Sequence, residues 1–89
     1  MMTSRKTLTY NLAMNLKSFA MAKNISQQDL AYMTSMNKSK VARIMNQASI
    51  DHCLIKDVFA IIDALGFKAN ALPDLCGGVM AFEDLAKYF

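Results

Sequence analysis

Apolar residues recur every three or four positions over most of this chain, the spacing of helices that each bury one face. The pattern predicts helices over residues 9–23, 54–65 and 79–88. Gly66 is expected to end the second of these, because glycine tolerates the left-handed backbone found just beyond many helix ends. The three apolar stripes are Leu12, Leu16, Phe19 and Ala20; Leu54, Val58, Ile61, Ile62 and Leu65; and Val79 or Met80 with Phe82, Leu85 and Phe89.

Helical spacing is lost between the last two of these segments. Residues 67–74 are expected to form either a loop or a short extended strand at 67–73, and Cys76, Gly77 and Gly78 a turn or hinge. The stripe of residues 79–88 has two interpretations: it closes the core, or it packs against a second copy of the chain or another protein. Residues 67–89 are therefore a candidate segment for dimer or partner contacts.

Two helix starts lie close together within residues 25–47. Ser26 can cap one helix, with Asp29 three residues later, and Asn37 can cap a second helix eleven residues further on. This spacing predicts a helix of about two turns, a bend and a new helix. Each start also has a pair of apolar residues at the positions of a hydrophobic staple: Ile25 with Leu30, and Met36 with Val41.

With these features, the segment resembles the helix-turn-helix of the lambda-repressor and Cro-like (Xre-type) family. The matching residues are Gln27, Leu30, Ala31, Met36, Lys38, Ser39, Lys40, Val41, Ile44 and Asn46. The resemblance covers residues 8–66 and implies a single all-α domain over 1–89, a five-helix bundle of the lambda-repressor type. Ser35 and Gln47 stand where the family usually has glycine, and a left-handed backbone at either would cost about 1–2 kcal/mol.

The resemblance also implies DNA contacts. Lys38 and Ser39 correspond to the principal base-reading positions, and Arg43 can meet the O6 and N7 atoms of a guanine with both arms of its guanidinium group. Gln27 is expected to meet a phosphate or to support the recognition helix. Asn37 and Lys40 are expected to hold the DNA backbone, and Asn46 is expected to contact a phosphate. Alternatively, Lys38, Lys40 and Arg43 belong to an ordinary solvated helix face. In that case Ser39 and Asn37 have only a capping or surface role.

Charge is divided unevenly along the chain. Residues 1–43 carry seven basic side chains against one acidic side chain, a net +6, whereas residues 44–89 carry three against six, a net −3. The basic half contains the helix-turn-helix segment. This polarity favours a polyanion as the partner of the first half and leaves the second half for protein contacts.

Other classes of function find little support in the sequence. His52 and Cys53 are adjacent, but neighbouring residues rarely point at each other, and no third group orients them. Cys53 and Cys76 lack metal-ligand spacing and are expected to be reduced thiols. No stretch approaches the ~20 apolar residues that span a bilayer. We therefore expect a soluble, cytoplasmic, nucleoid-associated protein that is not an enzyme and needs no metal or cofactor.

The sequence thus predicts a DNA-binding transcriptional regulator, a dimeric repressor of phage or prophage type that places helix 37–46 in the major groove of an operator. An antitoxin that binds a toxin protein and represses its own operon is the alternative. A third alternative is a protein-interaction adaptor that keeps the fold but has no role on DNA.

Overall fold

The computed structural model describes residues 5–68, 71–85 and 87, and these residues form helices and connections without a strand. The all-α class predicted from the sequence is confirmed. The helices are α1 (Arg5–Ala22), α2 (Gln27–Thr34), α3 (Lys38–Ile44), the 3-10 helix η1 (Ile50–His52), α4 (Ile55–Ala64), α5 (Leu72–Gly77) and α6 (Phe82–Leu85).

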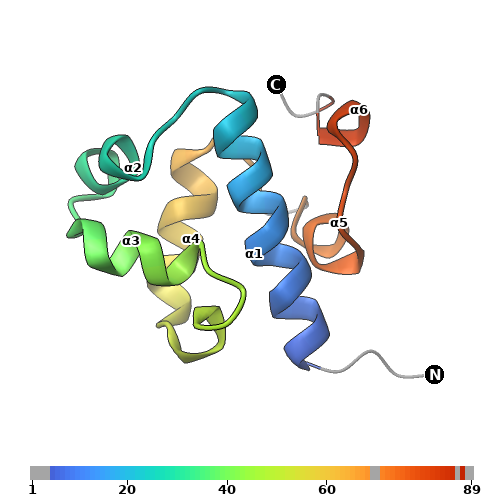
Figure 1. The fold of residues 1–89 in the computed structure, drawn as a ribbon, viewed down its shortest axis with the longest axis horizontal. Helices are drawn as coiled ribbons and strands as arrows, with labels where there is room; N and C mark the ends of the chain where they lie inside the picture. The colour runs from blue at the N-terminus through green and yellow to red at the C-terminus, as the bar shows by residue number, and fades with distance from the viewer. Residues whose placement is uncertain (1–4, 69–70, 86, 88–89) are drawn as a thin grey trace.

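Helix α1 lies between two groups of shorter helices (Figure 1). On one side, α2, α3 and α4 pack against one another; on the other, α5 and α6 pack against α1, which also contacts η1. Two of the helices predicted from apolar spacing, 9–23 and 54–65, correspond to α1 and α4. None of the described helices is both long enough and apolar enough to cross a membrane.

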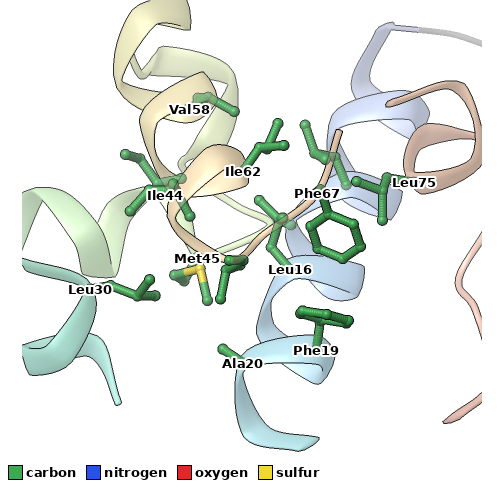
Figure 2. Close-up of a cluster of buried hydrophobic side chains, with 14 of the residues drawn as sticks. Leu16, Phe19, Ala20, Leu30, Ile44, Met45, Val58, Ile62, Phe67 and Leu75 are labelled. Atoms are coloured by element: carbon green, nitrogen blue, oxygen red, sulfur yellow. The ribbon is translucent and has the colours of Figure 1, made fainter. Parts of the chain in front are cut away.

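The predicted apolar stripes of α1 and α4 form the core, where they meet residues from α2, α3, η1 and α5 (Figure 2). Phe19 on α1 and Phe67 after α4 are in ring contact, with centroids 4.2 Å apart and planes inclined by 46°. Leu30 of α2 and Leu75 of α5 are fully buried in the same core. Leu54 is the exception among the predicted stripe residues: it is 58% exposed because it precedes the first turn of α4 as its N-cap residue.

Three helices end in the same way. Asn24, Ser35 and Gly66 have positive φ angles of 58°, 58° and 91° and reverse the chain after α1, α2 and α4. In each case the next residue is apolar, turns back toward the core, and donates its N–H to a carbonyl five residues earlier, which is the Schellman arrangement. These bonds join Ile25 to Ala20 (2.8 Å), Met36 to Ala31 (3.1 Å) and Phe67 to Ile62 (3.2 Å). The helix end predicted at Gly66 is confirmed.

A buried amide fixes the C-terminal segment on α1. Asn15 is fully buried, and its Nδ2 donates to the carbonyls of Leu75 (2.7 Å) and Gly78 (2.8 Å). Its Oδ1 accepts the backbone N–H of Met80 at 2.8 Å. One turn earlier on α1, Asn11 donates to the carbonyl of Cys76 at 2.9 Å. The two side chains thus satisfy carbonyls that the short helix α5 leaves free at its C-terminal end.

The C-terminal expectations need correction. Within 67–73, residues 69–70 lie outside the described residues, and the others form no strand; Leu72 and Pro73 instead begin α5. Proline suits the first turn of a helix because its φ is already fixed and no N–H is lost there. Cys76 and Gly77, predicted as part of a turn, complete this helix.

The helix predicted over 79–88 is also shorter than expected, because α6 spans only Phe82–Leu85. The N–H of Met80 is held by Asn15, and Met80 packs against the core while Val79 is 55% exposed. The side chains predicted to complete this apolar stripe, those of Phe82, Leu85 and Phe89, lie outside the described part of the chain.

Replacing Asn15 by alanine should destabilise the protein by about 2–3 kcal/mol, because the buried carbonyl of Leu75 and the partly buried carbonyl of Gly78 and N–H of Met80 lose their partner. Urea unfolding followed by circular dichroism measures this loss. Asn11→Ala, which removes a single partly buried bond, is the matched control and should cost about 1 kcal/mol. Equal losses in the two variants would contradict the clamping role of Asn15.

Candidate nucleic-acid interface

Both helix starts predicted in the 25–47 segment are present. The Ser26 Oγ accepts the N–H of Asp29 at 3.0 Å, and the Asp29 carboxylate accepts the N–H of Ser26 at 2.9 Å, forming a reciprocal capping box at the start of α2. At the start of α3, Asn37 Oδ1 accepts the N–H of Lys40 at 2.8 Å. The hydrogen bonds from the backbone and side chain of Ser26 lower the pKa of Asp29.

A three-residue turn of Ser35, Met36 and Asn37 joins α2 to α3. Ser35 takes the left-handed conformation, so the strain expected at this glycine position is present. Gln47 differs: of the described non-glycine residues, only Asn24 and Ser35 have a positive φ. The penalty considered for Gln47 therefore does not arise.

Helix α3 buries one side and exposes the other. Val41 and Ile44 are fully buried. The opposite side carries Ser39 and Arg43; Lys38 is the first residue of α3, and Asn46 lies just beyond its C-cap, Met45. These four exposed residues are called the α3 face. Ser39 and Arg43 are four residues apart, so their side chains are neighbours on one helical surface. The structure thus brings together four of the seven residues predicted to contact DNA.

Lys40 points away from the α3 face. Its Nζ lies 3.3 Å from the Asp57 carboxylate on α4, and the side chains are 44% and 13% exposed, respectively. This ion pair joins the first turn of α3 to the first turn of α4. No sequence pattern predicted this ion pair, because its partners lie seventeen residues apart on separate helices.

The other predicted residues have mixed surroundings. Gln27 is half-buried at the first position of α2. Asn37 is exposed, but its side-chain oxygen is used as the cap of α3. The Asn46 Oδ1 accepts the N–H of Ala48 at 2.7 Å, and Ser49 Oγ donates to the Arg43 carbonyl at 2.8 Å, so both bonds shape the chain after α3. The side-chain oxygens of Asn37 and Asn46 are thus used in hydrogen bonds within the chain. Among the described residues, their Nδ2 groups have no hydrogen-bond partner.

A hollow next to the α3 face contains residues that sequence reasoning did not connect with it. Its lining combines Lys40 and Arg43 of α3 with Ser49, His52, Cys53, Leu54 and Asp57. Burial raises the pKa of the Cys53 thiol; the nearby Arg43 opposes this shift and Asp57 adds to it. A raised pKa keeps the thiol protonated at neutral pH, so it is a poor nucleophile. In the described part of the chain, no three His, Cys, Asp or Glu side chains are grouped as metal ligands.

Comparisons of the chain with protein-family models, with curated proteins and with solved structures found no match. The functional interpretation accordingly rests on the residues themselves: an exposed polar and basic helix face, a capped support helix and a fixed turn between them.

Ser35→Gly should stabilise the protein by about 0.5–1 kcal/mol. Glycine removes a left-handed strain of about 1–2 kcal/mol, and its greater freedom in the unfolded chain returns about half of that gain. Urea unfolding of the variant and the wild type measures the difference. Asn24→Gly serves as the control, because asparagine tolerates this conformation and little is gained there. A loss of stability in Ser35→Gly would show that the Ser35 side chain supports the turn.

Proposed function

We propose that this protein is a sequence-specific DNA-binding transcriptional regulator with a helix-turn-helix domain of the lambda-repressor type. In this proposal, residues 37–46 enter the major groove, and the whole chain acts as a repressor associated with the nucleoid. The observation that carries it is the α3 face: Ser39 and Arg43 project from one side of a helix whose other side is anchored in the core, and the exposed Asn46 directly follows that helix.

The dimensions suit a groove. A helix with its side chains is about 10–12 Å across, and the major groove of B-form DNA is about 12 Å wide. Within it, Arg43 would read a guanine, and Lys38 and Ser39 would meet base edges near the start of the helix. Arginine favours this role because its planar donors match the O6 and N7 atoms of guanine.

Phosphates on either side of the groove would meet the helix-turn-helix. Gln27 lies at the N-terminus of α2, where backbone N–H groups and the helix dipole favour an anion. The excess of basic side chains in residues 1–43 adds a long-range attraction. Lys40 would contribute less than its position suggests, because Asp57 already neutralises much of its charge. Asn37 and Asn46 would donate to phosphate oxygens through their Nδ2 atoms.

Two copies would act together on an operator. The seven residues of α3 extend over about 10 Å, which corresponds to about three base pairs. Such a short contact gives little selectivity, so helix-turn-helix proteins commonly place two recognition helices on half-sites about one helical turn apart. A bound dimer would then block polymerase by occupying the promoter region.

The first test is binding to random duplex DNA over a range of salt concentrations. A copy that neutralises three to five phosphates should give a log–log slope of affinity against salt of about −3 to −4.5, because each phosphate contributes about −0.9. Fluorescence anisotropy with a labelled duplex measures the slope. A response that does not change with salt would rule out the proposed function.

Arg43→Ala provides the test of base reading, after a preferred site has been selected from random DNA. The variant should lose about 1–3 kcal/mol on the selected site and lose its preference at a single base pair. Lys68→Ala is the matched control, because it removes an exposed cation beyond the far end of α4. An equal loss on every sequence would make Arg43 a phosphate contact.

A further inference from the structure

Helix α4 exposes large apolar side chains on the side that does not pack into the core. Ile55 is 73% exposed and Phe59 is 42% exposed. Both border an apolar groove between α1, η1, α4 and α5, whose floor includes Leu12, Val58 and Leu72. Ile55 and Phe59 follow one another by one helical turn, so they form a continuous ridge along the edge of this groove.

Two opposite charges lie on the same side of α4. Lys56 and Asp63 are exposed and form no ion pair within the described residues. Seven residues separate them, which is two helical turns or about 10.5 Å, so they are too far apart to pair within one chain. They lie almost symmetrically about Phe59, Lys56 three residues before it and Asp63 four residues after it.

We propose that this surface, made of Ile55, Lys56, Phe59 and Asp63 and called the α4 face, binds a second copy of the chain with the two α4 helices antiparallel. A two-fold axis between Phe59 and Ala60 places Lys56 of each copy opposite Asp63 of the other. The same rotation brings the two Phe59 rings together at the axis and places Ile55 of each copy opposite Ala64 of the other, at the two ends of the contact.

The charge arrangement selects a second copy over other occupants. An interface with two-fold symmetry uses the same surface twice, so every group on it must find its complement elsewhere on that surface. Lys56 and Asp63 meet this condition, Phe59 meets itself at the axis, and the exposed Ile55 extends the apolar contact toward Ala64 of the other copy. Paired charges at the edge of an interface mainly set its register, while the apolar contacts supply affinity.

This inference names the contact surface of the dimer in the proposed function, but its test needs no DNA. Sedimentation equilibrium of the full chain should show a monomer–dimer equilibrium. Ile55→Asp and Phe59→Asp should each raise the dissociation constant at least about tenfold, since they place a charge at the centre of an apolar contact. Met21→Asp is the matched control, because Met21 is equally exposed, at 72%, on a different helix. Circular dichroism of each variant confirms that it is folded.

Charge reversal tests the pairing itself and does not disturb the apolar residues. Lys56→Glu and Asp63→Lys should each weaken the dimer, because each places like charges opposite one another. The double variant restores both pairs and should bring the dissociation constant back to within about threefold of the wild-type value.

Several outcomes would overturn the inference. A wild-type chain that stays monomeric at all concentrations would do so, as would a dimer that responds to Val79→Asp and not to the α4 variants. Failure of the double reversal to restore the dimer would overturn the pairing of Lys56 with Asp63 and with it the antiparallel arrangement. A chain that dimerises through α4 but gives no salt-dependent DNA binding would contradict only the proposed function. A chain that binds DNA but stays monomeric would contradict this inference and the two-copy operator binding, but not base reading by α3.

Discussion

Three residues with a left-handed backbone determine how this chain turns. Asn24, Ser35 and Gly66 each end a helix and direct the following apolar residue back into the core. After α1 and α2, that apolar residue also precedes the cap of the next helix, so one short segment closes a helix and opens another. Local hydrogen bonds therefore contribute to the directions of α2 and α3. Packing of Leu30, Val41 and Ile44 then holds the two helices in place.

The start of α3 is held by a second contact, the ion pair between Lys40 and Asp57. Exposed ion pairs add little stability, but the Asp57 carboxylate is mostly buried and needs a partner. The pair therefore matters more for geometry than for free energy. It holds the start of α3 against the start of α4, while the burial of Val41 and Ile44 turns Ser39 and Arg43 toward solvent. Exposure of the α3 face is thus a consequence of how α3 meets its neighbour.

The sequence predicted those features whose causes lie within a few residues. The caps at Ser26 and Asn37 and the end of α4 at Gly66 depend on bonds across three to five positions, and all three are present. The C-terminal segment was predicted wrongly because its conformation depends on Asn15, whose partners lie 60 to 65 residues away. The partner of Lys40 was missed for the same reason. The predicted DNA contacts remain predictions, although the structure places most of them on one face.

The clamp at Asn15 also bears on the apolar groove next to α4. Asn15 and Asn11 hold the end of α5 against α1, and two residues of α5, Leu72 and Cys76, line that groove. Without the clamp, α5 would lose the bonds that fix its position, and the groove would lose one wall. Two of the buried polar side chains thus have parallel roles: Asp57 links α3 to α4 beside the surface proposed to meet DNA, and Asn15 holds α5, which forms a wall of the groove next to the α4 face. Because both surfaces adjoin α4, the distance between two recognition helices in a dimer would be set by the rigid packing around this one helix.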